Sequence, residues 1–306
     1  MNTRERKKSV VCFGEVLWDN LPTGRTPGGA PMNVAYHLNQ LGIDSHLISR
    51  VGEDSSGVEL IEFLEELHLP VNRVQVDEQH HTSVVQASID PQTQEVSYEI
   101  VAPVAWDFIS WQPEYIPLLD EAAAFVFGSL SARNLVTRET LYKMLDYGTY
   151  HVFDVNLRAP HYEPSVIDAL MRKAHLVKLN SSELLLIASW YNKSCGKEEE
   201  AVDMLFNRFN MQEMVITKGS IGATYYTANY RYDYPAYPTI VADTIGSGDS
   251  FLAAFLAMKL SDQSVESTLD YAVAMGAFIT AKPGACPPYS KFDFNRYLWK
   301  KKLNIG

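Results

Sequence analysis

The sequence predicts an α/β fold with a mostly parallel central sheet and a small inserted β lid. Four continuous apolar runs, each ending in small or polar residues, are typical of parallel strands buried on both faces. Helical patterns separate these runs, so strands and helices alternate along the chain. Period-2 alternation around Asp90-Pro91 predicts a hairpin that interrupts this order, and we expect it to form the lid. The four runs are AAFVFGS, HVFDVNL, AHLVKLN and EMVITKG.

The composition is that of an ordinary globular protein of 306 residues, with 46% hydrophobic residues. We find no repeats or clear linker and expect a single domain over residues 1–306, with lid segments near 15–30 and 82–108. The net charge of −11 argues against nucleic acid or an anionic membrane as a partner. Three scattered cysteines do not suffice for a disulfide framework or a zinc site. The first apolar run stops at Phe13, too early for a signal peptide, so we expect a soluble, cytoplasmic protein.

A buried strand over Val10–Phe13 opens the expected sheet. No G-x-G-x-x-G motif follows it, which excludes a dinucleotide-binding turn of that type. The Pro/Gly-rich stretch at 20–31 predicts a loop or short hairpin after Asp19. The Asp19 carboxylate is either a turn residue or the acceptor for a hydroxyl group of a polar ligand.

A helix is expected directly after Gly28-Gly29. Apolar residues recur at helical spacing from Val34 onward, and Gly42 can end the helix. Asn33 lies in the first turn, although asparagine is a mediocre helix former. Its amide therefore either caps the helix locally or faces a ligand.

The stretch Val241–Ser250, VADTIGSGDS, predicts an anion site at the start of a helix. Gly246 and Gly248 allow successive backbone N–H groups to point one way, and the helix N-terminus adds partial positive charge. Asp249 then places a carboxylate beside a site suited to anions. It is either an N-cap or a base that takes a proton from an attacking hydroxyl group, and this stretch alone favours neither.

Polar side chains gather at the predicted strand ends, where open α/β sheets bind ligands. Asn180 and Glu183 either serve Mg²⁺ through its waters or only mark a helix start, with Ser181 or Ser182 as the cap and Glu183 favourable in the first turn. Arg158 offers a positive charge to phosphate oxygens or forms a salt bridge. The turn Thr217-Lys218-Gly219, followed by Gly222, is suited to lie against a nucleotide. Together these groups meet the needs of phosphoryl transfer, while the absence of a Walker loop and of H-R-D and D-F-G motifs excludes Walker-type NTPases and protein kinases.

Five motifs at family-like spacing carry a resemblance over nearly the whole chain. They are GGAPMN at 28–33, DVNLR at 154–158, N-x-x-E at 180–183, TKGSIG at 217–222 and DTIGSGD at 243–249. The chain resembles the ribokinase-like (PfkB) carbohydrate kinases, and within them the fructokinase-like branch. The resemblance implies a ribokinase-like three-layer sandwich with a small β-sheet lid. It also implies transfer of the γ-phosphoryl group of ATP to a primary hydroxyl of a ketose, with fructose as the first expectation.

The resemblance further implies a role for each matching residue. Asp249 would be the base, and the backbone N–H groups of Gly246, Ser247 and Gly248 would form the anion hole beside Arg158. The residues that would hold sugar hydroxyls are Asp19, Gly29 and Asn33, with Gly28-Gly29 as the hinge of lid closure. The residues that would serve ATP and Mg²⁺ are Asn180, Glu183, Thr217, Lys218, Gly219 and Gly222. Asp243 and Ile245, with the loop around Gly284, match positions that surround a monovalent cation such as K⁺ in some relatives.

Two departures from the family pattern matter. Ser247 stands where the signature has alanine, a small change that should preserve the backbone cradle. The lid stretch YEIVAPVAWD lacks the arginine that many fructokinases carry after the aromatic residue, so 2-keto-3-deoxygluconate and other sugars or nucleosides remain alternative substrates. An alternative from a different functional class is a sugar-binding sensor that has the same fold but no catalytic activity. A homodimer through the lid hairpins would cover their edge strands.

Overall fold

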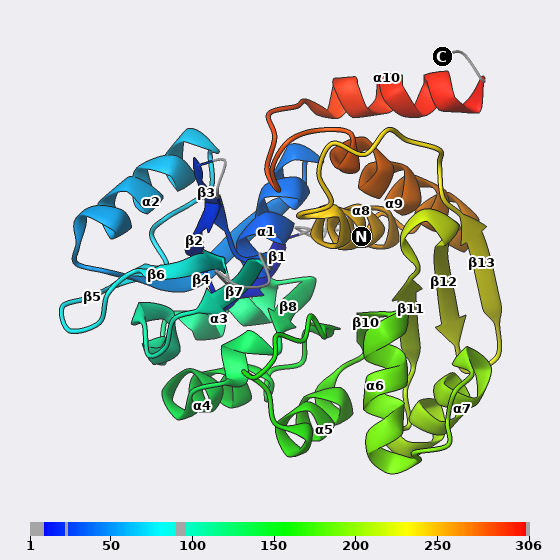
Figure 1. Cartoon of the computed structure of the whole chain (residues 1–306), viewed down its shortest axis with the longest axis horizontal. Coiled ribbons are helices and arrows are strands. Elements are labelled where there is room, and N and C mark those ends of the chain that lie inside the picture. The colour runs from blue at the N-terminus through cyan, green and yellow to red at the C-terminus, as the bar shows by residue number, and fades with distance from the viewer. Residues whose placement is uncertain (1–8, 22–23, 90–95, 304–306) are drawn as a thin grey trace, which may run out of the picture.

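The computed structural model describes residues 9–21, 24–89 and 96–303, and a nine-stranded sheet forms its centre (Figure 1). The strands are β1 (Ser9–Phe13), β4 (Asp44–Gly52), β5 (Val74–Asp77), β8 (Ala124–Gly128), β9 (Tyr150–Asp154), β10 (Leu176–Asn180), β11 (Glu213–Thr217), β12 (Gly222–Thr227) and β13 (Arg231–Pro235). Their order is β13-β12-β11-β10-β9-β8-β1-β4-β5. All neighbours from β5 to β11 are parallel, and β12 and β13 are antiparallel. The mostly parallel sheet is therefore confirmed.

Helices cover both faces of the sheet and give three layers (Figure 1). They are α1 (Ala30–Gln40), α2 (Ser55–Glu66), α3 (Tyr115–Glu121), α4 (Leu135–Met144), α5 (Pro164–Lys173), α6 (Ser181–Tyr191), α7 (Glu198–Phe209), α8 (Ser247–Lys259), α9 (Val265–Thr280) and α10 (Lys291–Lys302). Alternate residues of one strand enter opposite cores: Val10 and Cys12 pack on the α1, α8 and α9 side, and Val11 and Phe13 on the α3–α7 side. This two-sided burial explains why the central strands read as continuous apolar runs.

Helix α8 lies at the centre of one helical layer, packed against α1 and α9. Every residue from Phe251 to Ala257 is buried, because the segment FLAAFLA has no polar face. A helix that is apolar all round must be enclosed by the protein. Its first turn, at residues 247–249, is only partly buried and lies at the sheet edge where the parallel strands end.

The predicted lid is a second sheet of four strands in the order β3-β2-β6-β7. Its strands are β2 (Leu17–Leu21), β3 (Gly24–Gly28), β6 (Ser83–Ile89) and β7 (Val96–Ile100). The two hairpins, β2–β3 and β6–β7, are joined by parallel pairing of β2 with β6. Both lid segments expected from the sequence thus contribute to one sheet, while the turn at Asp90-Pro91 lies outside the described residues. Strand β3 is one edge of the lid, and its pairing with a second copy stays a prediction.

Some elements were not predicted from the sequence. The Tyr-rich hairpin at 222–237 adds β12 and β13 to the edge of the main sheet. Helix α3 has seven residues, three of them buried at helical spacing. Helix α10 buries Phe294, and Tyr297 and Leu298 pack partly buried against the same core. Trp106 is fully buried in the core. None of the described helices is long and apolar enough to cross a membrane.

Candidate active site

The first turn of α8 forms the predicted anion cradle. Gly246 precedes the helix with φ 72°, a left-handed conformation that glycine adopts without strain. A Cβ at this position would lie 2.7 Å from the Cα of Ala285, so only glycine fits. The Ser247 N–H donates to the carbonyl of Thr244 at 3.3 Å. The N–H groups of Gly248 and Asp249 have no acceptor within the helix, as in any first turn, and are suited to an anion.

Asp249 is the third residue of α8, and the N-cap position belongs to Gly246, without a side-chain cap. The N-cap alternative is therefore wrong. The Asp249 Oδ2 atom instead accepts a hydrogen bond of 2.8 Å from Asn33 Nδ2. Loss of water contact raises the pKa of the Asp249 carboxyl, and the nearby Lys178 ammonium opposes this rise. The structure thus places a hydrogen-bonded carboxylate beside the cradle.

Asn33 connects the first turns of α1 and α8. Its side chain is buried and reaches Asp249 across 216 positions of sequence. The Oδ1 atom of Asn33 accepts a hydrogen bond of 3.3 Å from the Cys286 thiol. The amide therefore faces the site, and local capping of its own helix is excluded. Burial raises the pKa of Cys286, so this thiol stays protonated at neutral pH.

The residues expected to hold the sugar and to form the hinge lie next to α1. Gly29 has φ 120°, and a Cβ there would collide with the backbone of Glu15. Asp19 on β2 lies beside Gly28, where a Cβ would be 2.5 Å from Asp19 Oδ2. Burial raises the pKa of Asp19 to about 6, although the positive charge of Arg158 opposes this. These contacts put Asp19 and the Gly28-Gly29 pair in one corner of the site.

Glu15 belongs to this corner, although the sequence analysis gave it no role. Its Oε1 atom accepts a hydrogen bond of 3.2 Å from Ala30 N at the start of α1, and its Oε2 atom is buried without a partner among the described residues. Burial raises the pKa of the Glu15 carboxyl to about 7. A protonated Glu15 needs less solvation than the carboxylate, so the folded chain favours the neutral form.

We expect Glu15→Gln to remove a pH dependence of stability. Because the folded pKa lies above the unfolded value, folding binds a proton at Glu15, and wild-type stability falls as pH rises from about 4.5 to about 7. The loss amounts to about 3 kcal/mol, and the uncharged glutamine cannot show it. Urea unfolding at pH 5 and pH 8 measures the difference. Glu66→Gln, an exposed carboxylate on α2, is the control and should unfold like the wild type at both pH values; an unchanged pH dependence in Glu15→Gln would contradict the assignment.

Arg158 follows β9 and is exposed. Its Nη1 atom donates to the carbonyl of Leu157 at 3.2 Å, and it has no ion pair among the described side chains. Its positive charge nevertheless lowers the pKa values of Glu15, Asp19 and Asp249 against the effect of burial. Arg158 therefore lies within electrostatic reach of all three carboxyl groups, as expected for a residue of the site.

A buried ion pair that the sequence analysis missed lies beneath the cradle. Lys178 Nζ is 2.9 Å from both carboxylate oxygens of Asp154, and the two residues are direct neighbours on parallel strands. A Cβ on Gly248 would lie 3.1 Å from Lys178 Nζ. The ammonium group therefore touches the first turn of α8. A lysine inside an apolar strand, LVKLN, was the available signal.

Among the residues expected to serve the nucleotide, Asn180 and Glu183 form a capping box at the start of α6. Asn180 Oδ1 accepts from Glu183 N at 2.9 Å, and Glu183 Oε2 accepts from Asn180 N at 2.8 Å. Glu183 Oε1 accepts from Leu157 N at 2.8 Å and so ties α6 to the segment after β9. Loss of water contact raises the pKa of Glu183, and these two N–H donors oppose the rise. Capping at this helix start is therefore confirmed, but the cap is Asn180 and the expectation of Ser181 or Ser182 is wrong.

The cap is compatible with the expected Mg²⁺ bound through water. Both oxygens of Glu183 already accept backbone hydrogen bonds, which favours contact with the metal through one of its waters over direct ligation. No group of three or more His, Cys, Asp or Glu side chains in the described part of the chain is arranged to hold a metal ion. Mg²⁺ commonly keeps most of its waters and binds through phosphates and one or two carboxylates. The residues present fit that mode.

The turn after β11 carries the other residues expected to serve the nucleotide. Thr217 ends the strand, Gly219 has φ 55°, and a Cβ on Gly222 would collide with the carbonyl of Tyr234. Lys218 lines a cavity of about 220 Å³ between this turn and β13. Its Nζ atom forms an ion pair of 2.6 Å with Glu198. The turn is thus shaped by glycines and bordered by a cavity.

Asp243 joins the two loops named as a cation site. Its Oδ1 atom accepts from Ile245 N at 3.0 Å, and its Oδ2 atom accepts from Gly284 N at 3.1 Å. The loop that enters α8 is therefore fastened to the loop that follows α9. This bridge supports the backbone around Gly246.

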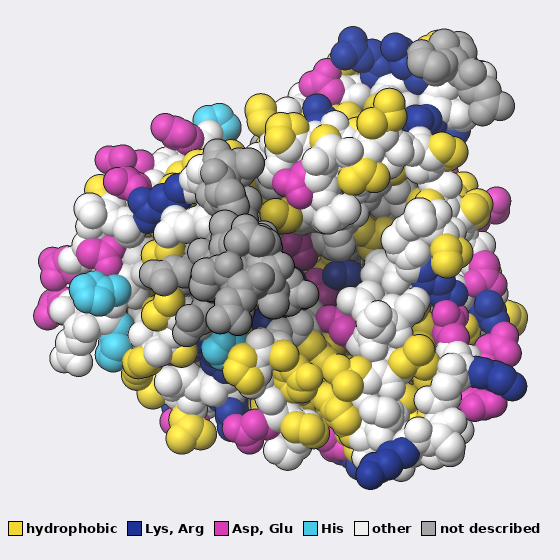
Figure 2. All heavy atoms as spheres, viewed as in Figure 1, with side chains coloured by type: hydrophobic (Ala, Val, Ile, Leu, Met, Phe, Trp, Pro, Cys, Tyr) yellow, Lys and Arg dark blue, Asp and Glu magenta, His cyan; other side chains and the backbone are white. Residues whose placement is uncertain are grey.

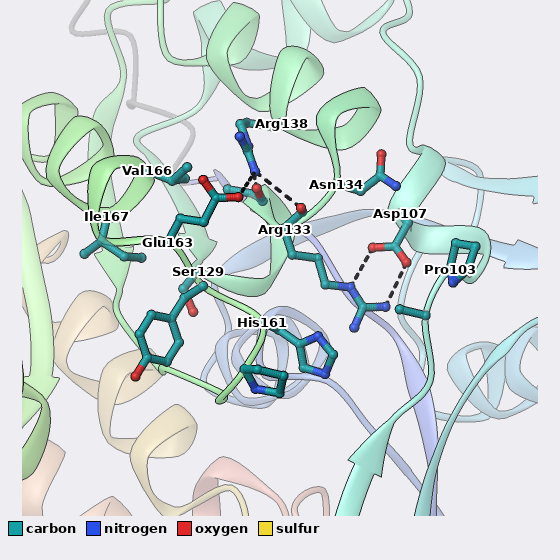
Figure 3. A pocket seen from close by; sticks show the side chains of 14 residues that line it. Pro103, Asp107, Ser129, Arg133, Asn134, Arg138, His161, Glu163, Val166 and Ile167 are labelled. Atoms are coloured by element: carbon teal, nitrogen blue, oxygen red, sulfur yellow. Dashed lines mark hydrogen bonds and ion pairs between the residues drawn. The ribbon is translucent and has the colours of Figure 1, made fainter.

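The surface is hollowed between the lid half of the molecule and the β11–β13 half, and acidic and basic side chains line the hollow (Figure 2). A separate cavity of about 410 Å³ lies among η1 (Ala105–Phe108), η2 (Leu130–Ala132), α4 and the β9–α5 connection (Figure 3). Arg133 contacts Asp107 there at 2.7 Å, and Arg138 approaches Glu163 at 3.9 Å. None of the predicted site residues lines this cavity.

Comparison with known proteins gives a consistent result. The pfkB family of carbohydrate kinases matches residues 4–291. A fructokinase from Klebsiella pneumoniae is 29% identical over 311 residues, which covers 94% of this chain and 99% of the relative. A crystal structure of fructokinase with bound ATP from Xylella fastidiosa superposes with a TM-score of 0.84 at 22% identity, covering 97% of this chain and 99% of the other.

A second structure, fructokinase from Vibrio cholerae in a form bound to fructose, ADP and calcium, has a TM-score of 0.82 at 22% identity and covers 96% of this chain and all of the other. These likenesses confirm the ribokinase-like fold. The family match covers far more than half of the sequence and agrees with the motifs that meet at α8. The chain therefore belongs to the pfkB family of carbohydrate kinases.

Proposed function

We propose that this sugar kinase transfers the γ-phosphoryl group of ATP to a primary hydroxyl of a ketose, with fructose as its substrate. One observation carries the proposal: the Asp249 carboxylate lies in the first turn of α8, directly beside the unpaired N–H groups of the cradle. A base and an anion hole are thereby adjacent, as an in-line transfer requires. The hydrogen bond from Asn33 orients the carboxylate.

In the proposed reaction, Asp249 takes the proton of the sugar hydroxyl. The hydroxyl oxygen forms the new bond to the γ-phosphorus, and the bond from that phosphorus to the β–γ bridging oxygen breaks, which releases ADP. The N–H groups of Gly246, Ser247 and Gly248 stabilise the negative charge of the transferring group, with Gly248 best placed because the Ser247 N–H already has an acceptor. Arg158 adds a mobile positive charge at the mouth of the site.

Sugar hydroxyl groups would bind Asp19, Asn33 and the backbone at Gly29, with Gly28-Gly29 as the hinge of the lid. The raised pKa of Asp19, about 6, leaves it ionised above neutral pH, where it accepts hydrogen bonds from hydroxyl groups. The nucleotide would lie along the turn after β11. The residues proposed for it are Asn180, Thr217, Lys218, Gly219 and Gly222.

Mg²⁺ bound with the phosphates would neutralise their charge, and Glu183 would hold one of its waters. Asp243 and the carbonyl of Ile245 remain proposed neighbours of a monovalent cation such as K⁺. The bridge from Asp243 to Ile245 and Gly284 supports this assignment, because a cation between these loops would share the carboxylate.

Fructose is favoured because the Klebsiella relative is named fructokinase and the Vibrio neighbour was crystallised with fructose. The lid stretch without the expected arginine keeps 2-keto-3-deoxygluconate and other sugars or nucleosides as the second candidates. A non-catalytic sensor is disfavoured, because such a protein has no need for a base beside an intact cradle.

The test measures ADP release with ATP and Mg²⁺ against a panel of sugars. We expect fructose to give the highest kcat/KM, by at least about tenfold over glucose, ribose, 2-keto-3-deoxygluconate and adenosine. A higher value for another sugar would reassign the substrate while keeping the kinase. Tight sugar binding without ADP release from any sugar would favour the sensor instead.

A further inference from the structure

Lys178 occupies a position where an apolar residue is expected. It lies on β10 between Val177 and Leu179, which are fully buried, and only 9% of its own side chain is exposed. Its side chain shares the sheet face of Leu176, which packs in the core beneath α8. Asp154, its direct neighbour on β9, is 4% exposed. At the end of this face the core therefore changes from apolar residues to a buried ion pair.

Stability alone does not account for such a pair. Removing two charges from water costs several kcal/mol per ion, and apolar residues of similar size are often as stable or more stable. The attraction between Lys178 and Asp154 offsets part of this cost, and the two 2.9 Å hydrogen bonds satisfy the carboxylate. The position of the pair beneath the cradle indicates a role beyond stability.

The ammonium group lies directly under the cradle. Lys178 Nζ is close enough to Gly248 that a single added methyl group would stand 3.1 Å from it. The charges of Asp154 and Asp249 both favour the protonated lysine, and its pKa is raised despite burial. Lys178 thus brings a permanent positive charge to the turn that carries both the anion-binding N–H groups and the carboxylate.

We propose that Lys178, held by Asp154, is a positioning residue for phosphoryl transfer, whose ammonium group supports the Gly248–Asp249 turn and keeps the Asp249 carboxylate ionised. This inference rests on the proposed function of Asp249 as the base. Lysine suits the task because its compact charge fits under a backbone turn, where the planar guanidinium of arginine is larger.

The pH at which the Asp249 carboxyl becomes ionised depends on every charged group that faces it. Arg158 and Lys178 favour its ionised form, whereas Asp154 and Glu15 oppose it, and Asn33 donates a hydrogen bond to it. The remaining polar neighbours are the thiol of Cys286 and, through Lys178, the carboxylate of Glu183. Lys178 is the buried cation of this set, so its removal should raise the pH at which Asp249 becomes ionised.

The experiment compares Lys178→Met, the double variant Asp154→Asn/Lys178→Met, and Lys178→Arg. The double variant leaves no unpaired buried charge and so protects the test against simple misfolding. We expect kcat of both methionine variants to fall about 100-fold with KM for sugar and ATP within threefold, the size seen when one charge-stabilising group is lost from a site. In Lys178→Met the acidic limb of kcat/KM should move to higher pH by at least about one unit. Lys178→Arg should recover at least about a tenth of wild-type kcat.

Arg133→Met is the matched control. It breaks an equally buried pair with Asp107, at 6% and 1% exposure, away from the predicted site residues. Its stability should fall while its pH profile stays that of the wild type. A double variant that folds and keeps the kcat of the wild type would overturn the proposal, as would an unshifted acidic limb in Lys178→Met or an equal shift in Arg133→Met. Different results would contradict the proposed function itself: absence of ADP release from the wild type, or full activity of Asp249→Asn.

Discussion

Asp249→Asn is expected to lower kcat about 1,000-fold while the Kd for ATP changes less than threefold. The amide keeps the size of the side chain and can still accept the hydrogen bond from Asn33, but it cannot take a proton from the sugar. General-base catalysis contributes about 10²–10⁴-fold to enzymatic rates. ATP binding should be spared, because the residues proposed to bind the nucleotide lie at the ends of β10 and β11. Steady-state ADP release and equilibrium titration with ATP measure the two quantities.

Asp146→Asn is the control for this change. Asp146 is an exposed carboxylate paired with Lys173 at 3.1 Å, and its loss should leave kcat at the wild-type value. Near-normal turnover of Asp249→Asn would mean that another group accepts the proton. A parallel loss of ATP affinity would instead mean that Asp249 shapes the nucleotide site.

Gly246→Ala is expected to lower kcat about 100-fold and to destabilise the fold by at least about 1–2 kcal/mol. A left-handed φ of 72° carries that cost for alanine. The new methyl group would also stand 2.7 Å from the Cα of Ala285, so the loop must move and the N–H groups of the cradle lose their alignment. Loss of one aligned donor typically costs 10²–10³ in rate. Urea unfolding and steady-state kinetics test the two effects.

Gly42→Ala separates backbone strain from damage to the cradle. Gly42 also has a left-handed φ, 82°, but an added methyl group would meet only Lys291 Nζ at 3.7 Å. This variant should lose similar stability and keep wild-type kcat. If Gly246→Ala retained full activity, the backbone of the first turn would have no part in binding the transferred group.

Local patterns were sufficient to predict the elements of the fold that are long and strongly apolar. The central strands and α8 are buried on all sides, and such segments read as uninterrupted apolar runs. The α10 helix shows the opposite case, because it is mostly polar and fully buries only Phe294, with Tyr297 and Leu298 partly buried beside it. The place of β12 and β13 also escaped, since a hairpin pattern does not say which sheet it joins.

Within the candidate site, motifs pointed to residues whose chemistry is local. The glycines around Asp249 predict a turn that leads into a helix. The spacing of Asn180 and Glu183 is that of a capping box. Lys178 and Glu15 were missed, because a charged residue in an apolar context gains its meaning from a distant partner. The position of Lys178 becomes informative only through its contact with Gly248 on α8, and that of Glu15 only through its hydrogen bond at the start of α1.

The sequence by itself determined the family, the α/β alternation with its lid, and the cradle at the start of α8, because backbone conformation and helix capping depend on near neighbours. Only the tertiary structure decided that Asp249 is no N-cap, that Asn33 donates to it from 216 residues away, and that the Lys178–Asp154 pair lies beneath both. The physical reason is that charge and desolvation act through space. A carboxylate acquires its proton affinity from whichever groups the fold brings against it.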